Sequence, residues 1–320
     1  MIILRERMEN NPSFSFKWWM NLVECPWCSE KPFPNEPPIK MECRFCRSPF
    51  EVRNNVLEWI PDGQKTKRYD AAKGKLDIVK RLLNPLSNPL LPMRYWSKIR
   101  TEQYYRRTLN DNNLAKKWAE HYLTGIDIPK NAMVLDHGCG RGRNVGLLSQ
   151  LGYQVAGQDM TVDKWWARLP DSGFQVIPRG SERLPWKSSS YDLVNDDVVI
   201  RYLPEEMVKS FVKEIRRVIK PGGYWLILET NNQGFGRKHA QLKSTLSLNL
   251  MRSLTKQNGF KEIDVSYEGF YAPFFPFAIN FLRKQCGPWP MNISDYESWM
   301  AEQIPPEKRG LWLLRLRRED

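Results

Sequence analysis

Four cysteines near the start of the chain have the spacing of a metal site. They are Cys25, Cys28, Cys43 and Cys46, in the arrangement C-x2-C-x14-C-x2-C. Each C-x2-C pair can turn two thiolates toward one point, and two such pairs complete the tetrahedral four-sulfur shell that zinc prefers. Disulfides or a redox-active pair are the alternatives, but the doubled motif and a reducing cytosol count against both. The spacing therefore predicts a zinc site, and sites of this kind are usually structural.

A second stretch, "VLDHGCGRGRN" at residues 134–144, places three glycines directly after an apolar run. The run 132–136 predicts a buried strand, and the glycines predict a turn into a helix. A dinucleotide turn requires G-x-G-x-x-G, whereas Gly138, Gly140 and Gly142 are spaced G-x-G-x-G. Asp136 would repel a pyrophosphate and attract an ammonium or sulfonium group. The turn therefore fits S-adenosylmethionine (SAM) better than a dinucleotide.

The next predicted strand, "YQVAGQD", ends in an acidic residue. This residue, Asp159, stands 23 positions after Asp136. An acidic side chain at about this separation typically accepts hydrogen bonds from a ribose diol. The predicted ligand therefore contains a ribose.

The rest of the chain continues the alternation of strands and helices. Its patterns predict a helix capped near Asn110 or Asp111, a strand at 191–195, a helix at 204–219, a strand opened by the turn in "KPGGYWLILET" and a helix near 242–257. The segments "FKEIDVSYE" and "LWLLRLRR" predict two closing antiparallel strands. The chain is therefore expected to be an α/β protein.

Residues 112–320 together resemble the class I SAM-dependent methyltransferases. The resemblance is greatest to the small-molecule branch that includes the ubiquinone-biosynthesis and tellurite-resistance methyltransferases. It is carried by "VLDHGCGRGRN", "GYQVAGQD", "ERLPW…YDLV" and "KPGGYWLI", in that order. It implies a Rossmann-like, mostly parallel sheet of seven strands and SAM as the cofactor.

The N-terminal region resembles a different module. The order "CPWC…MECRFCRSPFEVRNNVLEWIPD" is similar to the short zinc ribbon of the activator subunit of tRNA and protein methyltransferases. We therefore expect a small zinc ribbon at residues 1–61 and a helical linker at 62–111, ahead of the methyltransferase domain at 112–320.

The methyltransferase resemblance implies cofactor roles for individual residues. It assigns the methionine part of SAM to Asp136 and the glycine turn, the ribose hydroxyls to Asp159 and one adenine face to Met160. The acidic residue that contacts adenine in the family falls on Gly180, which leaves the neighbouring Ser181 or Glu182 for that contact. The predicted cofactor-binding residues are Asp136, Gly138, Cys139, Gly140, Asp159, Met160, Ser181, Glu182 and Asn195.

Methyl transfer from a sulfonium mainly requires positioning of the acceptor, with a base when the acceptor is a hydroxyl. The candidate catalytic residues are Asp196 and Asp197 at the end of a strand and His137 in the glycine turn. Capping of the next helix by the carboxylates, and packing of the histidine beside its strand, are the structural alternatives. An Asn/Asp-Pro-Pro-Tyr signature is absent and "NDDV" stands in its place, which argues against methylation of exocyclic amines.

The stretch 269–309 is where this family often builds its acceptor pocket. Its aromatic residues, followed by Arg283 and Lys284, predict an apolar or lipid-like acceptor with an anionic group, although a hydrophobic lid would use the same residues. Two prolines interrupt the most apolar part, 269–282, which suits peripheral contact with a membrane surface but not a span. Charges near the N-terminus exclude a signal peptide, so a cytoplasmic protein is expected.

Net charge supports a second hypothesis. Lys and Arg exceed Asp and Glu by 49 to 36, and residues 1–130 contain 23 basic and 15 acidic side chains. A basic surface favours anionic partners such as nucleic acid. Three functions therefore remain open: an O- or C-methyltransferase of a small or lipid-like molecule, an RNA methyltransferase that grips phosphates with its ribbon and residues 62–130, and a SAM-binding scaffold.

Overall fold

The computed structural model describes just over half of the chain. It covers residues 18–26, 28, 42, 46, 48, 50–53, 56–59, 112–160, 163, 166, 168–169, 171–177, 183–203, 205–231, 246–268 and 303–320. The predicted linker at 62–111 and the aromatic stretch up to residue 302 lie outside these residues. So do the candidate site residues Cys43, Ser181 and Glu182.

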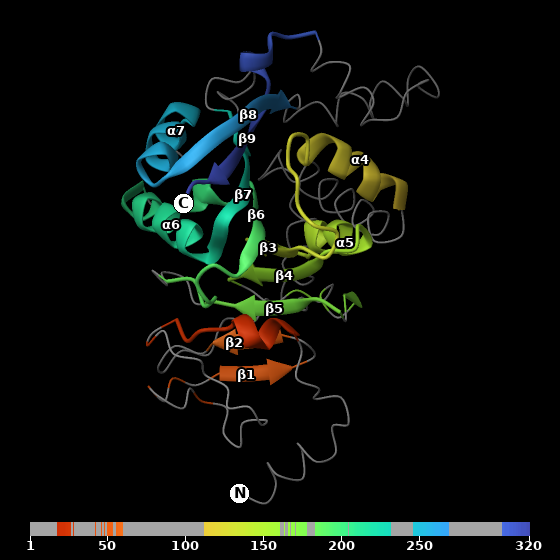
Figure 1. The fold of residues 1–320 in the computed structure, drawn as a ribbon, viewed down its shortest axis with the longest axis vertical. Helices are drawn as coiled ribbons and strands as arrows, with labels where there is room; N and C mark the ends of the chain where they lie inside the picture. Colours follow the sequence, from red (N-terminus) through yellow and green to blue (C-terminus); the bar gives the residue numbers. More distant parts are fainter. Residues whose placement is uncertain are drawn as a thin grey trace, which may run out of the picture.

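A single mixed sheet runs through the described residues (Figure 1). Five strands are parallel: β3 (Met133–His137), β4 (Gln154–Asp159), β5 (Gly173–Val176), β6 (Tyr191–Asp197) and β7 (Ile219–Thr230). β9 (Leu311–Arg318) is antiparallel to both of its neighbours, β7 and β8 (Phe260–Glu268). The order β5-β4-β3-β6-β7-β9-β8 has the seven strands that the family resemblance implies, including β5, which the sequence patterns did not locate. The Rossmann-like fold class is therefore confirmed.

Two further strands lengthen this sheet at its β5 edge. β1 (Phe50–Arg53) and β2 (Val56–Trp59) form an antiparallel hairpin, and β2 pairs in parallel with β5. Without this pairing β5 would be an edge strand with unpaired backbone groups. All four residues of β2 are buried, as expected of an interior strand. The sheet of the described residues therefore has nine strands rather than seven.

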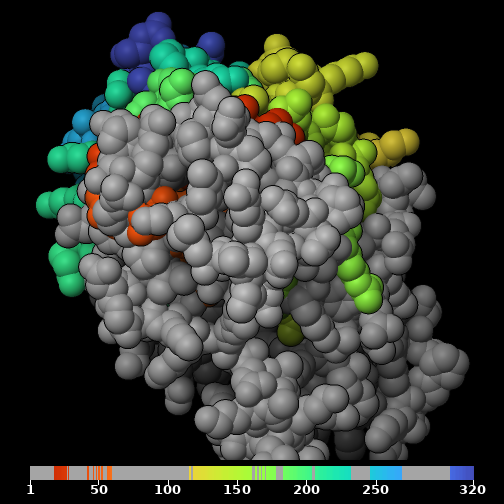
Figure 2. Space-filling model, turned by 90° about the horizontal axis from the view of Figure 1, so that it is seen from below, coloured from red at the N-terminus to blue at the C-terminus, as the bar shows by residue number. Residues whose placement is uncertain are grey.

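Helices cover both faces of the sheet. α4 (Asn112–Tyr122) and α5 (Arg143–Gln150) lie on one face, and α6 (Glu205–Val218) and α7 (Leu248–Gln257) lie on the other (Figure 1). Seen from the β1 end, the green-to-teal and the yellow surfaces appear on opposite sides of the orange strands (Figure 2). Two short 3₁₀ helices, η3 (Ile200–Tyr202) and η5 (Pro306–Lys308), complete the later chain. None of the described helices has the length and apolar character that crossing a bilayer requires.

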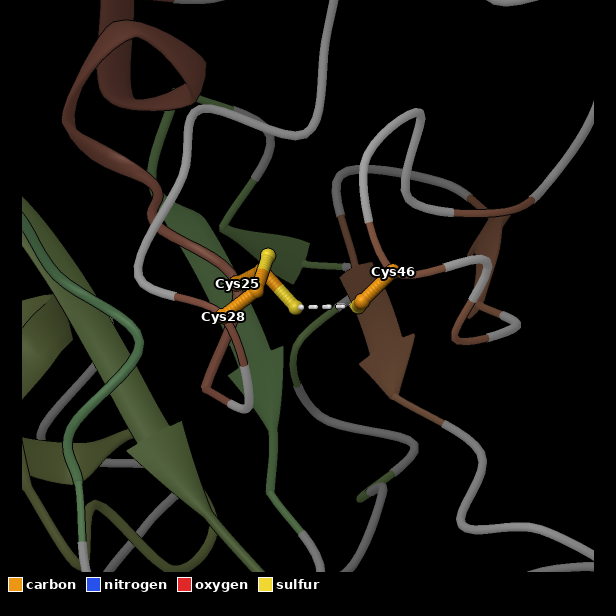
Figure 3. A group of neighbouring side chains, drawn as sticks. All are labelled: Cys25, Cys28 and Cys46. Atoms are coloured by element: carbon orange, nitrogen blue, oxygen red, sulfur yellow. Dashed lines mark hydrogen bonds between the residues drawn. The ribbon is translucent and has the colours of Figure 1, made fainter.

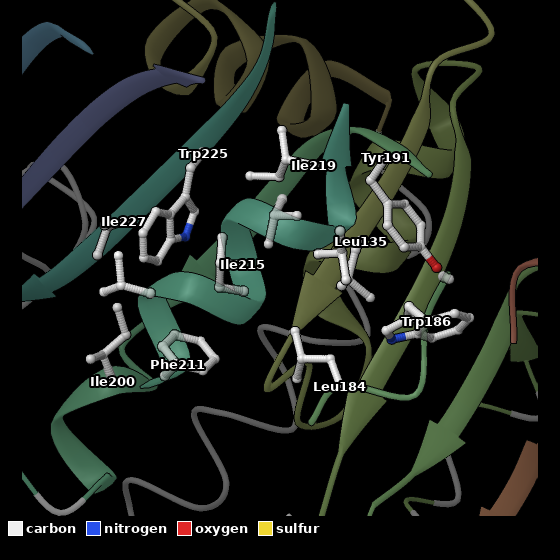
Figure 4. Close-up of a cluster of buried hydrophobic side chains, with 14 of the residues drawn as sticks. Leu135, Leu184, Trp186, Tyr191, Ile200, Phe211, Ile215, Ile219, Trp225 and Ile227 are labelled. Carbon is white, nitrogen blue, oxygen red and sulfur yellow. The ribbon is translucent and has the colours of Figure 1, made fainter. Parts of the chain in front are cut away.

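The strands divide their side chains between two cores. Successive side chains of a strand point to opposite faces, so Trp225 and Ile227 of β7 join the core under α6 while Leu226 joins the core under α4 and α5. Phe211 and Ile215 of α6 lie beside Trp225 in the same core (Figure 4). α6 and α5 therefore pack against opposite faces of the same central strands.

The start of the described chain packs into the core under α6. The 3₁₀ helix η1 (Trp18–Leu22) places Trp19 over Gly173, where an added Cβ would lie only 2.1 Å from the indole ring. Trp59 of β2 donates a hydrogen bond to Gln175 Oε1 of β5 at 3.0 Å, in a fully buried position. Glu24 forms an ion pair with Arg183 at 2.7 Å. The N-terminal residues are thus built into the same sheet and core as the later strands.

The Trp19 contact makes a prediction about stability. Gly173→Ala should overpack the contact and destabilise the protein by about 1–3 kcal/mol, and Trp19→Ala should cost about 3–5 kcal/mol through the lost ring. In the double variant the new methyl group no longer meets an indole. The double variant should therefore lose less stability than the sum of the losses in the two single variants. Urea unfolding of the four proteins measures this coupling, and strictly additive costs would contradict the packing described.

Candidate functional site

The glycine turn lies at the carboxyl end of the central strand β3. Gly138, Gly140 and Gly142 all have positive φ angles, of 64°, 52° and 81°, which favour glycine. A Cβ on Gly138 would lie 2.4 Å from the side chain of Val199, in the loop that follows β6. The missing side chain therefore lets the loops after β3 and β6 approach each other closely.

Asp136 is buried beside this turn. Its side chain is only 1% exposed, and Asn195 Nδ2 donates to its Oδ1 at 2.7 Å. Within the described part of the chain, the other carboxylate oxygen, Oδ2, is buried and has no hydrogen-bond partner. Burial raises the pKa of Asp136 to about 7, against the lowering effect of the Asn195 hydrogen bond. This site therefore lacks one donor, and a cationic donor would suit it best.

Asp159 links the end of β4 to the same turn. Its Oδ2 accepts a hydrogen bond from the Gly140 amide at 2.9 Å, and its Oδ1 accepts one from the Met160 amide at 2.7 Å. Trp166 Nε1 donates to the Gly140 carbonyl at 2.9 Å. Met160 is 51% exposed at the end of the strand. The carboxylate thus braces the turn through both of its oxygens.

The end of β6 carries a second carboxylate on this side. Asp197 pairs with Arg143 and accepts a hydrogen bond from Asn144 Nδ2 at 3.0 Å; both partners lie in the first turn of α5. Asp197 does not cap the 3₁₀ helix that follows β6, since that helix has no side-chain cap. The pair instead fastens the start of α5 to the end of β6.

The other two catalytic candidates lie on the opposite face of the sheet. His137 Nδ1 and Asp196 Oδ1 are 2.6 Å apart, and Trp225 Nε1 donates to Asp196 Oδ2 at 2.6 Å. Asp196 is fully buried, while the His137 side chain is 11% exposed and its ring packs against Phe211 of α6. Both carboxylate oxygens of Asp196 are therefore occupied, and only the imidazole reaches the surface.

The register between β3 and β6 explains this division. Asp136 lies opposite Asn195, and His137 lies opposite Asp196. Neighbouring positions along a strand face opposite sides, so the first pair faces α4 and α5 while the second faces α6. Three candidate catalytic residues of the sequence thus occupy two separate environments.

The remaining candidates fall into two groups. Cys139 is buried, its amide donates to the Gln158 carbonyl at 2.9 Å, and burial raises the pKa of its thiol well above the ordinary value. Ser181 and Glu182 lie outside the described residues.

Sequence reasoning missed Arg143 and Asn144 as partners of Asp197, although both stand in the quoted glycine motif. Their role follows only once β6 is known to neighbour β3.

Three of the four predicted metal ligands are described, and they lie together (Figure 3). The sulfur atoms of Cys25, Cys28 and Cys46 are all within 4.8 Å of one another. Cys25 Sγ and Cys46 Sγ are 3.5 Å apart, and Cys46 Sγ is 3.1 Å from Ser48 Oγ. Burial alone raises the pKa of Cys46, but hydrogen bonds with Ser48 and the two neighbouring thiols outweigh it and lower the pKa to about 7.

Two protein families match this chain. A methyltransferase domain family matches residues 135–227, and the family of the tellurite resistance protein TehB matches residues 97–169. The first match begins on β3 and ends on β7, so it contains the glycine turn and the ends of β4 and β6. This part of the chain therefore matches the methyltransferase domain family.

Individual relatives are more distant. The demethylmenaquinone methyltransferase of Bacillus licheniformis is 28% identical over 131 residues, which cover 38% of this chain and 56% of the relative. The sterol 4-C-methyltransferase strm-1 of Caenorhabditis elegans is 23% identical and covers 34% of each chain. A tRNA (carboxymethyluridine(34)-5-O)-methyltransferase of Arabidopsis thaliana is 27% identical, over 35% of this chain and 27% of the relative. The chain spans about half the length of such relatives or less.

The buried Asp136 predicts a pH-dependent stability of the ligand-free protein. Its pKa is about 7 in the folded state, above the ordinary 3.8, so between these values the folded protein keeps a proton that the unfolded chain loses. The free energy of unfolding should therefore fall as pH rises from about 4 to about 7, by up to about 4 kcal/mol, and level off above.

Urea unfolding of the wild type and of Asp136→Asn at a series of pH values measures this effect. The variant lacks the titration, and all other titrating groups cancel in the difference between the two proteins. The free energy of unfolding of the variant should rise relative to that of the wild type as pH rises from about 4 to about 7. A constant difference would show that Asp136 keeps an ordinary pKa.

Proposed function

We propose that this protein transfers a methyl group from SAM to a small or lipid-like molecule, by O- or C-methylation. The observation that carries the proposal is the buried Asp136 oxygen without a partner, placed beside the glycine turn at the carboxyl edge of a Rossmann-like sheet. SAM has an ammonium group on its amino acid part, which would supply the missing donor and a compensating charge. Bound SAM supplies an electrophilic methyl group on its sulfonium.

The residues around the turn would hold the rest of the cofactor. Asp159, at the end of β4 beside the turn, would accept hydrogen bonds from the ribose hydroxyls, and the exposed Met160 would cover one adenine face. The backbone of Gly138, Cys139 and Gly140 would face the methionine part. Asn195 contributes indirectly, because it orients the Asp136 carboxylate.

His137 is the base that we propose for a hydroxyl acceptor, which would reach the carboxyl edge of the sheet from the α6 side. Its Nδ1 faces Asp196, and this contact favours the tautomer in which Nδ1 carries the proton and Nε2 is left as the basic nitrogen. Asp196 acts on the imidazole, not on the acceptor, because both of its oxygens are already occupied. Asp197 is held by Arg143 and Asn144 and would keep the cofactor-binding turn next to β6.

The proposed class of acceptor rests on two supports. The Bacillus and Caenorhabditis relatives are named for methylation of demethylmenaquinone and of a sterol, and the aromatic stretch 269–309 has the composition of an apolar pocket. The Arabidopsis relative is named for tRNA methylation, and together with the basic N-terminal residues it supports RNA as the second candidate acceptor.

Labelled SAM distinguishes these acceptors. The purified chain is incubated with methyl-labelled SAM and either an organic-soluble extract or total RNA from cells. We expect label in the organic-soluble fraction. Label in RNA would instead support RNA as the acceptor. Binding of SAM without any methyl transfer would indicate that the protein is a SAM-binding scaffold and not an enzyme. Asp159→Ala should bind SAM about 1–3 kcal/mol more weakly and serves as the control that labelling depends on this site.

His137→Gln tests the proposed base in the same assay. With saturating SAM it should lower the rate of labelling by about 10²-fold or more while leaving the affinity for SAM, measured by calorimetry, unchanged. Asp196→Asn should also lower the rate, because it removes the carboxylate that orients the imidazole. Variants that lose folding stability but keep the wild-type rate would show that His137 is a packing residue.

We also propose that the N-terminal cysteines bind one zinc ion. The three described sulfur atoms already lie within reach of a common tetrahedral centre, and Cys43 would supply the fourth ligand. Residues near this cluster share the core and sheet of the later chain, since β2 pairs with β5 and Glu24 pairs with Arg183. The metal would therefore stabilise one edge of the methyltransferase sheet and not only its own loop.

Metal analysis of the full-length chain tests this assignment. The protein should contain about one zinc per chain, and Cys46→Ser should lose it, whereas Cys286→Ser, outside the motif, should retain it. Because structural zinc contributes directly to folding, Cys46→Ser should also speed amide exchange in residues 56–59 and 173–176. Equal zinc contents in the two variants would disprove the site, and unchanged exchange would confine the metal to its own loop.

A further inference from the structure

A basic groove lies at the edge of the sheet opposite the glycine turn. It has a volume of about 580 Å³ and is lined by Ser188, Ser189, Lys213, Arg216, Arg217, Gln257, Asn258, Gly259 and Arg318. These residues come from the segment before β6, the end of α6, the end of α7 and the end of β9, close to the C-terminus marked in Figure 1. Asp136 and His137 stand at the other ends of the parallel strands, so this groove is separate from the candidate cofactor site.

The four cations of the groove differ in how they are held. Arg217 is neutralised by Glu214 at 2.8 Å and lies 3.6 Å from Glu24. Among the described residues, no carboxylate forms an ion pair with Lys213, Arg216 or Arg318. Burial and the charge of Arg216 lower the pKa of Arg318, while Asp320 acts in the opposite direction. The charges of Lys213, Arg216 and Arg318 therefore lie close together, and none of them has an ion-pair partner among the described residues.

The ends of the helices hold only one of these three cations. Both α6 and α7 end at the groove, and cations near helix ends often bond to the last carbonyl groups. Here those carbonyls have other donors: Ser189 N bonds to the Arg217 carbonyl at 2.8 Å, and Asn258 Nδ2 bonds to the Leu254 carbonyl at 2.8 Å. Arg318 uses one terminal nitrogen, NH1, for the carbonyls of Arg216 and Ile219. Lys213 and the guanidinium of Arg216 have no such bond among the described contacts.

The backbone also leaves room for these cations. Gly259 ends the turn after α7 with φ of 69°, and a Cβ there would lie 3.2 Å from Arg216 Nε. Lys213 and Arg216 are three positions apart on α6, so they share one face of the helix and repel each other. The repulsion between these two cations lowers the stability of the protein unless a bound anion neutralises it.

We propose that this groove binds a small diphosphate-bearing molecule through Lys213, Arg216 and Arg318. Guanidinium groups match phosphate oxygens in geometry and charge, and the hydroxyls of Ser188 and Ser189 can donate to the same oxygens. A groove of this volume is in the range of small-ligand sites. The described residues of its lining include no aromatic side chain on which a nucleic-acid base could stack, which favours a small anion over single-stranded nucleic acid.

Calorimetric titration of the full-length chain with inorganic pyrophosphate at low ionic strength tests the proposal. The wild type should bind, and Arg216→Gln and Lys213→Gln should each bind about tenfold more weakly or worse. Lys209→Gln is the matched control, because it removes the same charge from an exposed position of α6 outside the groove. Its affinity should stay close to that of the wild type. Melting temperatures measured without ligand show whether each variant is folded. If Arg216→Gln does not fold, Lys213→Gln still tests the groove, because Lys213 is exposed.

Three results would overturn the proposal. The first is the absence of pyrophosphate binding by the wild type. The second is an equal loss in Lys209→Gln and the groove variants, since this would indicate general electrostatic attraction. The third is tighter binding of a uridylate oligonucleotide than of pyrophosphate, with the same loss in the groove variants, since this would assign the cations to a nucleic-acid backbone. None of these outcomes depends on the proposed methyltransferase activity.

Discussion

The parallel pairing of β3 with β6 determines the chemistry of the carboxyl edge. Its register sets Asp136 beside Asn195 and His137 beside Asp196. A shift of β3 by one residue would exchange the faces of Asp136 and His137. Asp136 would then meet the apolar core under α6, and the imidazole would enter the space beside the glycine turn. The apolar residues before them, Val134 and Leu135, prevent such a shift because each is fully buried in a different core.

The described N-terminal strands β1 and β2 extend this sheet. Contacts of the described N-terminal residues reach β5 through β2, the segment before β6 through Glu24 and Leu22, and α6 through the ion pair with Arg217. A loop that binds a metal in a module of its own would need few of these contacts. The pairing of β2 with β5 also removes an exposed edge strand, which proteins otherwise have to protect against association.

Local sequence patterns predicted most of the later fold. The strands at 260–268 and 311–318 have the predicted bounds, and the predicted helix at 204–219 corresponds to α6 within one residue at each end. The helix expected near 242–257 is described from Leu248, where Ser247 caps it by accepting a hydrogen bond from the Leu250 amide. Short-range periodicity and capping carry this information, so one sequence is sufficient for it.

What the sequence did not reveal depends on residues far apart in the chain. Trp19 meets Gly173, a residue with no side chain to signal a contact, and β2 meets a strand more than a hundred positions away. The same holds for the pair of Asp197 with Arg143 and for the basic groove, whose cations come from α6 and β9. Asp136, Asp159 and the cysteines were visible as candidates because their residue types and spacing are local. The division of His137 and Asp196 from Asp136 required the sheet register.

The raised pKa of Asp136 connects the cofactor site to proton binding. Near neutral pH the empty site holds a carboxyl group that is partly protonated because it is buried without a countercharge. An ammonium group placed against Oδ2 would favour the ionised form, so binding of such a ligand would release a proton. By the reciprocity of linked equilibria, loss of that proton strengthens binding of the ligand by the same factor. A cation-bearing ligand would therefore bind more tightly as pH rises toward about 7, whereas a neutral ligand that donates no hydrogen bond to Oδ2 would gain nothing, so burial of this carboxylate favours a ligand with a positively charged donor.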